Sequence, residues 1–256
     1  MSVYGFSNVL PTNWALEAAK GNIPQTAILT RFGFNPDVDT ASAEGIIQQG
    51  GNYVPPTTAR IHNISSSDIN DTSAGTGART ILIFGIDGSY NRATETVTMN
   101  GTTNMPTVNS YHHIHLVQII TAGSTANNIG TISAVAQTDA TTTITVSPGF
   151  NQSCSSVYLV PVGYKGYIMK IRARMQQSTA TSGANIALLI QPFGGVYQTK
   201  TILGLNNSGN SEVENDYSYS CPFIIQEKSF IKLRCLIATN NNTEIMAEYD
   251  LIVVQN

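Results

Sequence analysis

Three of the four histidines fall in one short run, Tyr111-His112-His113-Ile114-His115. The surrounding residues predict a β-strand, in which alternate side chains point to the same face, so His113 and His115 share one face. Two imidazoles on one face are suited to a transition metal, above all if three chains met at an axis and supplied two each. The simpler interpretation is that both are ordinary polar side chains of a strand.

Two pairs of carboxylates could offer oxygen ligands to calcium. Asp37 stands near Asp39, and Asp68 stands near Asp71, but neither pair has the spacing of a known calcium loop. Aspartate in a turn more often accepts hydrogen bonds from its own backbone, and this is the alternative for both pairs.

We expect no enzyme and no bound cofactor. The sequence contains no G-x-S-x-G elbow, no H-E-x-x-H pair and no phosphate-binding loop. Gly75-Thr76-Gly77 precedes a strand and not a helix, so it does not fit a dinucleotide-binding turn. Three further acids have no neighbouring base or nucleophile, although two carboxylates of a glycosidase could still meet in space. These acids are Glu44, Asp87 and Glu95.

The composition is poor in charge and rich in neutral polar residues. Asp, Glu, Lys and Arg make up 11% of the 256 residues, against about 25% in an average soluble domain. A neutral surface can be buried against a neighbour with little charge desolvation, which is typical of an assembly component but also of β-rich lectins and adhesins. The net charge of −3 and the lack of a basic stripe argue against nucleic acid as a partner.

The sequence also bears on the compartment. No run of about 18 apolar residues is present, so we expect no membrane span. The first residues have neither the charged start nor the apolar run of a signal peptide. Cys154, Cys221 and Cys235 show no CxxC spacing, and we interpret them as free, buried thiols of a chain made in a reducing cytosol.

The periodicity predicts an all-β protein with one short helix. Asn13 offers a helix cap, Trp14 to Lys20 are enough for two turns, and Gly21 is a plausible stop. From Gly21 to Pro56 the sequence is irregular and rich in Pro and Gly. Because a structureless stretch of this length is unusual inside a compact domain, an extended arm is favoured.

Strand-like runs separated by Gly, Asn and Asp clusters follow from Thr58 onward. A fresh set begins after Pro161-Val162-Gly163-Tyr164. We therefore expect two antiparallel β-sandwich (jelly-roll-like) domains, residues 57–160 and 161–256, preceded by an extended N-terminal docking arm, residues 1–56. The expected strands are Thr80–Ile86, Thr94–Met99, His112–Thr121, Gly130–Ala136, Thr141–Val146, Tyr167–Gln176, Ala187–Ile190 and Val196–Leu203.

The last two strands can be aligned as a hairpin around Asn240-Asn241-Asn242. Placing Leu233 opposite Tyr249 brings apolar residues together on one face and sets Arg234 opposite Glu248 on the other. A shift by one residue would destroy both patterns, so this register is predicted. In Tyr167–Gln176 a basic row alternates with apolar residues and faces either solvent or an acidic partner. The row is Lys170, Arg172 and Arg174.

The segment Arg31–Thr40, RFGFNPDVDT, differs from everything after it. It has neither strand alternation nor a helical stripe, and Pro36 removes a backbone donor and favours an extended conformation at Asn35. We therefore expect it to lie along other subunits and not in the chain's own core. The expected assembly contacts of the arm are Trp14, Phe32, Phe34, Asn35, Pro36, Asp37 and Asp39.

The sequence resembles virion structural proteins of tailed phages in four phrases. The family has an FG-NPDVDT segment near the N-terminus, then a β-domain, then a second β-domain after a VPAGYTGY-like phrase, so the resemblance covers nearly the whole chain. It implies a structural role in the particle and carries over no active site. At residues 43–48 this chain has Ala-Glu-Gly-Ile-Ile-Gln in place of the acidic and aromatic residues that are common there in the family. The phrases are RFGFNPDVDTASAEGIIQQGGNYVPP from Arg31, SSSDINDTSAGTGARTILIFGIDGSYN from Ser65, ETVTMNGTT from Glu95 and VPVGYKGY from Val160.

The resemblance implies a non-enzymatic bacteriophage virion protein, made in the host cytoplasm, whose arm docks on major capsid or neck proteins. Decoration or cement of the head, a neck or collar element, and a tail or fibre attachment all stay open. We expect a homotrimer. Many copies that each hold by a modest contact would together bind tightly.

Two other classes of function are carried beside this one. A receptor- or carbohydrate-binding adhesin or fibre component would hold a host-surface glycan through neutral side chains and an aromatic platform. A glycoside hydrolase or depolymerase would act through paired carboxylates. The tyrosines that could form the platform are Tyr111, Tyr217 and Tyr219.

Overall fold

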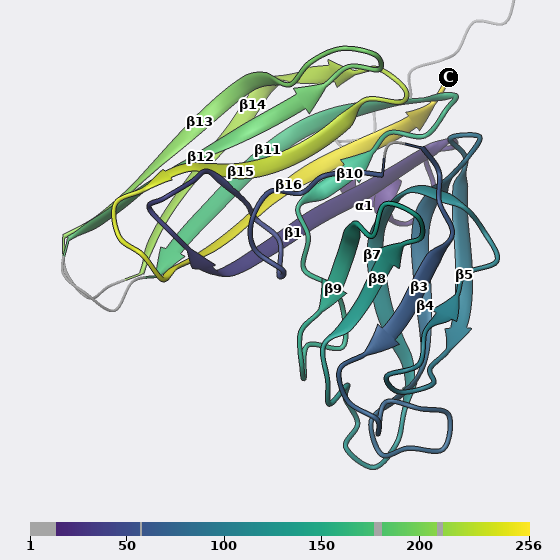
Figure 1. Cartoon of the computed structure of the whole chain (residues 1–256). Helices are drawn as coiled ribbons and strands as arrows, with labels where there is room; N and C mark the ends of the chain where they lie inside the picture. The colour runs from purple at the N-terminus through teal and green to yellow at the C-terminus, as the bar shows by residue number, and fades with distance from the viewer. Residues whose placement is uncertain (1–13, 57, 177–180, 209–211) are drawn as a thin grey trace, which may run out of the picture.

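The computed structural model describes residues 14–56, 58–176, 181–208 and 212–256 (Figure 1). Over these residues the chain forms one short helix, α1 (Trp14–Ala19), and sixteen strands in four small antiparallel sheets. The all-β prediction with a single short helix near the N-terminus is thereby confirmed. The helix ends where it was expected to, before Gly21, whose φ of 78° lies in the left-handed region that favours glycine.

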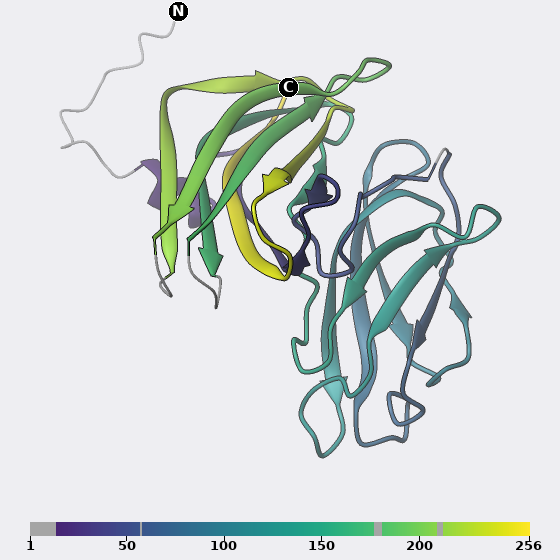
Figure 2. The same ribbon diagram turned by 60° about the vertical axis from the view of Figure 1, so that its left-hand side comes forward.

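The sheets are grouped in two lobes (Figures 1 and 2). The first lobe holds two sheets built from the middle of the chain. Sheet III has the order β6–β3–β8–β9 and sheet IV has the order β5–β4–β7. Their strands are β3 (His62–Ser66), β4 (Ala78–Asp87), β5 (Arg92–Thr98), β6 (Met105–Pro106), β7 (Tyr111–Ala122), β8 (Ile132–Ala136) and β9 (Thr142–Val146).

The second lobe combines the C-terminal half of the chain with strands from its beginning. Sheet I has the order β1–β16–β11–β14, and sheet II has the order β10–β15–β12–β13, with β2 also paired to β15. Their strands are β1 (Thr26–Val38), β2 (Glu44–Gly45), β10 (Val157–Leu159), β11 (Tyr164–Gln176), β12 (Ser182–Gln191), β13 (Gln198–Asn207), β14 (Val213–Ile225), β15 (Phe230–Ala238) and β16 (Thr243–Gln255).

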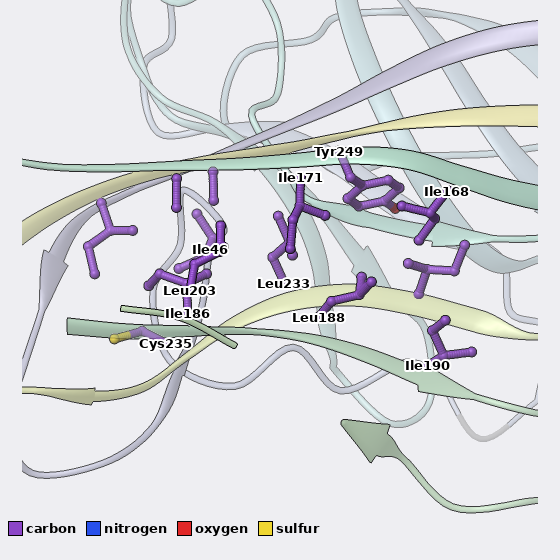
Figure 3. Close-up of a cluster of buried hydrophobic side chains, with 14 of the residues drawn as sticks. Ile46, Ile168, Ile171, Ile186, Leu188, Ile190, Leu203, Leu233, Cys235 and Tyr249 are labelled. Atoms are coloured by element: carbon purple, nitrogen blue, oxygen red, sulfur yellow. The ribbon is translucent and has the colours of Figure 1, made fainter. Parts of the chain in front are cut away.

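The larger apolar core lies between sheets I and II (Figure 3). Ile171 and Tyr249 come from sheet I and Leu188 and Leu233 from sheet II, and all four are buried. A second core joins sheets III and IV in the first lobe, with Ile81 as one of its buried residues. Each lobe therefore has its own core, which apolar burial stabilises by roughly 25 cal/mol per Å² of apolar surface.

Residues 26–38 are the largest departure from the sequence prediction. They were expected to be part of an arm without strand character, but they form β1 and pair antiparallel with β16, from Thr26 opposite Val254 to Val38 opposite Thr243. A bulge between Asn35 and Val38 accommodates Pro36. The predicted arm over residues 1–56 is thus wrong for the part that forms β1 and β2, because these strands belong to the sheets of the second lobe.

The predicted hairpin of the last two strands is also wrong. β15 and β16 lie in different sheets, because the segment around Asn241 crosses from sheet II to sheet I. Leu233 and Tyr249 do both point into the same core, but from opposite sides of it (Figure 3). The periodicity identified the inward faces correctly and could not tell a hydrogen-bonded neighbour from a partner across the core.

The strands expected from Thr80 to Leu203 all have counterparts, with ends that differ by a few residues. Two details differ. A bulge between Ile168 and Lys170 breaks the strict alternation predicted for β11, so Ile168 is buried and Met169 is not. The second lobe also begins before the predicted boundary at residue 161, because β10 pairs with β15. Among the described helices, none is long and apolar enough to cross a membrane.

Candidate functional site

A group of buried polar and aromatic residues lies where the two lobes meet. A third apolar cluster joins the lobes here, and β7 of the first lobe passes close to β10 of the second. We call this region the junction. The cluster consists of Ile47, Tyr53, Ile86, Val157, Leu159 and Phe230, with Tyr90 and Tyr197 packed against it.

Tyr53 and His113 form one polar contact of the junction. The hydroxyl of Tyr53 lies 2.5 Å from Nδ1 of His113, and neither residue is more than 3% exposed. The ring of Phe230 from β15 stacks on Tyr53 at 5.4 Å and meets His113 edge-on at 5.1 Å. Three segments far apart in sequence are therefore fixed against one another by aromatic packing and one hydrogen bond.

His115 and Arg31 form the neighbouring part of the junction. The His115 ring lies 5.1 Å from the ring of Tyr158, and the guanidinium of Arg31 lies 5.1 Å from the same tyrosine ring. Arg31 is 9% exposed and His115 is 7% exposed. Tyr249 places its hydroxyl in this region as well, and that atom has no hydrogen-bond partner among the described residues.

Burial keeps both histidines neutral. It lowers the pKa of His113 to about 3, and the positive charge of Arg31 adds to the shift. Burial lowers the pKa of His115 well below its usual value, again with a contribution from Arg31. The same loss of hydration lowers the pKa of Arg31 and raises that of Tyr158. The two histidines of the junction are therefore neutral, and its charge comes from basic side chains such as Arg31 beside Tyr158 and Lys232 beside Tyr197.

The metal site proposed for His113 and His115 gains no support from this arrangement. The two residues do share a face, with ring centroids 6.0 Å apart, but that face is closed against the second lobe. The simpler alternative, two ordinary polar side chains of a strand, needs no metal, and both side chains are buried in the structure. No group of three or more His, Cys, Asp or Glu side chains arranged to hold a metal occurs within the described ranges.

Several of the expected assembly contacts are instead occupied inside the chain. Asn35 is fully buried, and its amide donates to Glu44 Oε2 at 3.1 Å and to the carbonyl of Gly45 at 3.0 Å. Asp39 accepts a hydrogen bond from the backbone N–H of Asn242 at 3.3 Å. Phe34 stacks on Phe150 of the first lobe at 5.7 Å. These contacts hold β1 and the turn after it in place.

The other expected assembly contacts are exposed at the surface, except Trp14, whose side chain is not among those that the structure describes. Phe32 is 36% exposed on the outer face of sheet I, where it borders a shallow hollow with Arg172 and Met246. Pro36 and Asp37 are exposed beside the bulge. Trp14 opens α1, and its side chain lies outside the described part of the structure.

The carboxylates considered for calcium or catalysis mostly bind their own backbone. Asp71 is fully buried and accepts hydrogen bonds from the Ser66 hydroxyl at 2.6 Å and from the backbone N–H groups of Ala78, Ile129 and Gly130 at 2.7 to 3.0 Å. Asp71 thus ties together distant segments, and the local turn interpretation fits Asp68, which accepts from the backbone N–H of Asn70. The carboxylates of Asp68, Asp87, Glu44 and Glu95 likewise accept from backbone N–H groups near them.

The basic row of β11 meets acidic residues within the same sheet. Lys170 lies 3.0 Å from Asp216, and Arg172 pairs with Glu214 at 3.2 Å and also with Glu248. The acidic partner that the sequence left open is therefore present in the chain itself, on β14 and β16. Because these side chains are partly exposed, each pair contributes about 1 kcal/mol or less.

Two of the three candidate glycan tyrosines stand together. Tyr217 is 50% exposed, its ring lies 4.9 Å from that of Tyr219, and Phe223 lies 4.9 Å further on. They border an open pocket of about 460 Å³ with Lys200 and Thr201. The third tyrosine, Tyr111, is fully buried, so it cannot form part of an exposed platform.

Sequence reasoning missed the residues that form the junction apart from the histidines. Arg31, Tyr53 and Tyr158 come from three separate segments, and nothing in their spacing links them. The one available signal was Arg31, an arginine in a segment that also alternates Gly33 and Asn35 with phenylalanines. That alternation marks a strand whose buried face is polar.

Comparison with known proteins adds little. No family model and no curated protein matches the chain. The crystal structure of the infectious bursal disease virus VP2 subviral particle is similar over 90% of this chain and 72% of that one, with 9% sequence identity and a TM-score of 0.23. The structure of the infectious bursal disease virus Gx strain is similar over 90% of this chain and 73% of that one, with 8% sequence identity and a TM-score of 0.23. At these values the likeness carries no argument about function.

Proposed function

We propose that the protein is a non-enzymatic structural component of a tailed-phage virion. The four phrases that resemble this family are the first support. The observation that carries the proposal is what the residues of those phrases do here. Asn35 and Asp71, from the first two phrases, hold the chain's own backbone in place. Sequence motifs whose residues stabilise the fold are expected in a family of structural proteins.

The low charge of the chain supports the same role. With 11% charged residues, the surface can be covered by a neighbouring subunit at little electrostatic cost. Phe34 and the junction tie the two lobes together, so the protein is suited to act as one rigid body. In this proposal the two pairs of facing sheets are two jelly-roll-like β-sandwiches, the copies associate as a homotrimer, and the protein decorates or cements the capsid or neck.

The structure alters where docking is proposed. The strand expected to reach across neighbours is the edge strand of sheet I and is paired with β16 along one side, so that side of its backbone is already occupied. We place the docking contacts on the exposed side chains of the same segment, which are Phe32, Pro36 and Asp37. Their partner would be a major capsid or neck protein, and virion assembly would follow synthesis in the host cytoplasm.

The test is the presence of the chain in purified particles. Mass spectrometry of gradient-purified virions should detect it at a fixed number of copies, and the sedimentation mass of the purified chain should be that of a trimer. Phe32→Ala should lower its incorporation into particles, whereas Phe193→Ala, which removes another exposed ring, should not. Recovery of the chain from infected cells but never from particles would refute a virion role.

The alternative is a receptor- or carbohydrate-binding adhesin of the virion, and the platform of Tyr217, Tyr219 and Phe223 favours it. Aromatic rings in edge-to-face contact, beside a pocket lined by Lys200 and Thr201, are suited to a sugar ring. On a glycan array, Tyr217→Ala should abolish binding and Phe193→Ala should leave it unchanged. Lack of any glycan binding by the native chain would remove this alternative.

A further inference from the structure

A pocket of about 280 Å³ opens between the two lobes beside the junction. The first lobe contributes Arg92 and His115, and the second contributes Arg31 and Tyr158. Apolar side chains fill the remaining wall. They include Leu29, Phe84 and Leu116.

The charges that line this pocket are of one sign. Arg31 is 9% exposed, and its Nε has no hydrogen-bond partner in the described part of the chain. Its guanidinium contacts the ring of Tyr158, and that of Arg92 lies 4.4 Å from the ring of Tyr164. No ion pair between either arginine and a carboxylate is found among the described residues.

Buried charge of this kind is costly without a counter-charge. An isolated ion taken out of water loses several kcal/mol or more, and proteins ordinarily pair such a charge or bind a ligand to it. The other groups around Arg31 supply no negative charge. Burial keeps His113 and His115 neutral, and it raises the pKa of the Tyr158 and Tyr249 hydroxyls. Nδ1 of His115 and the hydroxyl of Tyr249 also lack described partners.

We propose that this pocket binds one oxoanion, a carboxylate or a phosphate, between Arg31 and Arg92. The planar guanidinium matches both groups, because it donates two parallel N–H bonds to their oxygens. The apolar wall suits a carboxylate carried on a short apolar stem. Since the pocket takes residues from both lobes, an anion there would also stabilise the lobes against each other.

The anion could be free in solution or could be the acidic side chain of a neighbouring subunit. The chemistry of recognition is the same, so one experiment addresses both. Thermal unfolding of the full chain is followed at low ionic strength with sodium phosphate, sodium benzoate or sodium chloride at matched ionic strength. Phosphate or benzoate should raise the midpoint in a saturable way that chloride does not reproduce, as expected for a ligand of the folded state.

Variants decide whether the pocket is responsible. Removing one charged donor should weaken the apparent affinity about tenfold or more. Arg31→Gln tests the buried group. Arg92→Gln tests the exposed guanidinium of the pocket. Because Arg92 is at the surface, this variant should fold even if Arg31→Gln does not. Lys200→Gln removes the same unit of charge far from the pocket and should leave the anion response unchanged.

Two results would overturn the proposal. One is that neither phosphate nor benzoate stabilises the native chain beyond chloride. The other is that both Arg92→Gln and Arg31→Gln are stabilised by phosphate or benzoate as strongly as the native chain. Where the anion does bind, sedimentation of the chain with and without it separates the sources. Dissociation of the oligomer by phosphate would assign the pocket to a neighbour's carboxylate, and an unchanged mass would assign it to a free anion.

Discussion

The Tyr53 hydroxyl lies 2.5 Å from Nδ1 of His113, and this contact joins the segment before β3 to the beginning of β7 at the place where the two lobes meet. Both side chains are buried, and Phe230 of the second lobe packs against each ring. A hydrogen bond in so closed a place has no water to replace it. The stability of the junction should therefore be sensitive to the loss of one oxygen atom.

Tyr53→Phe tests this directly. The ring and its stacking on Phe230 remain, while His113 loses the partner of its Nδ1, so the free energy of unfolding should fall by about 1–3 kcal/mol. Chemical denaturation with urea measures the change. Tyr217→Phe is the matched control, because half of that side chain is exposed and its change should stay within about 0.5 kcal/mol. Equal effects of the two substitutions would show that the hydroxyl of Tyr53 is not held as described.

Limited proteolysis should separate the beginning of β1 from the residues before it. Lys20 lies in an exposed turn after α1, whereas Arg31 is buried in a strand paired with β16. Trypsin should therefore cut the native chain after Lys20 and leave Arg31 intact, giving a stable fragment that begins at Gly21. N-terminal sequencing or mass spectrometry of the fragments reads this out. Denatured protein should be cut at both sites, and native cleavage after Arg31 at the rate seen for Lys20 would restore the free arm.

The sequence revealed most strands and hid β1, and the cause is visible in β1 itself. Strand recognition relies on apolar residues at alternate positions facing the core. Before its bulge, β1 has Arg31, Gly33 and Asn35 at its buried positions, while Phe32 and Phe34 point the other way. The period of two is present, but with polar or small residues inside and aromatic residues outside. Burial of Asn35 against Glu44 and Gly45 could not be anticipated without knowing the fold.

The wrong hairpin has a different cause. Apolar alternation located the inward faces of β15 and β16, and both faces do line the core of the second lobe. Two strands that face each other across a core show the same apolar matching as two that share a hydrogen-bonded ladder. The charged residues gave a false second pattern: Glu248 pairs with Arg172 of β11, and Arg234 donates to the carbonyl of Ala43. The local pattern thus showed which face of each strand points into the core, but not which strand lies beside it in the sheet.

The candidate site was predictable only in part. The sequence placed His113 and His115 on one face of a strand, and the structure has them so. It could not indicate that the second lobe covers this face, because Arg31 and Tyr158 approach from segments on either side of the first lobe in sequence. Contacts between lobes depend on the packing of whole sheets, for which no short spacing rule exists.

The buried histidines predict a loss of stability in mild acid. Burial holds the pKa of His113 at about 3 in the folded chain, below the value near 6.5 expected once unfolding exposes it. Between these two values the unfolded chain binds more protons, so the stability present above pH 6.5 falls as the pH falls towards 3. The slope is roughly 1.4 kcal/mol per pH unit for each such histidine. His115 shifts in the same direction.

Urea unfolding at pH 7, 6 and 5 measures this slope. His113→Gln should reduce it by about one histidine's share, whatever the variant does to stability at pH 7. His112→Gln is the control on the same strand, because that ring is only partly buried and its pKa is less deeply shifted. A slope that is the same in His113→Gln and in the native chain would mean that His113 is solvated or paired in the folded state.

The backbone of β1 at Gly33 lies so close to other main-chain atoms that only a glycine fits there. Substitution of Gly33 is therefore the sharpest test of the position of β1. A Cβ placed there would collide with the backbone carbonyl of Ile46 and come within 2.8 Å of the backbone nitrogen of Ser156. Both obstacles are main chain and cannot rotate aside. Gly33→Ala should therefore destabilise the protein by about 1–3 kcal/mol, as overpacking in a closed site does.

Gly204→Ala on β13 provides the contrast, because its nearest neighbour would be the Asn185 side chain at an ordinary 3.6 Å. Alanine suits a strand better than glycine, so that variant should be neutral or slightly more stable. The midpoint of thermal unfolding compares the two. If Gly33→Ala were as stable as Gly204→Ala, the segment could not be clasped between Ile46 and Ser156, and the docking arm would again be the better account of Arg31–Thr40. A fall confined to Gly33→Ala would mean that the segment Arg31–Thr40 is packed against its own chain.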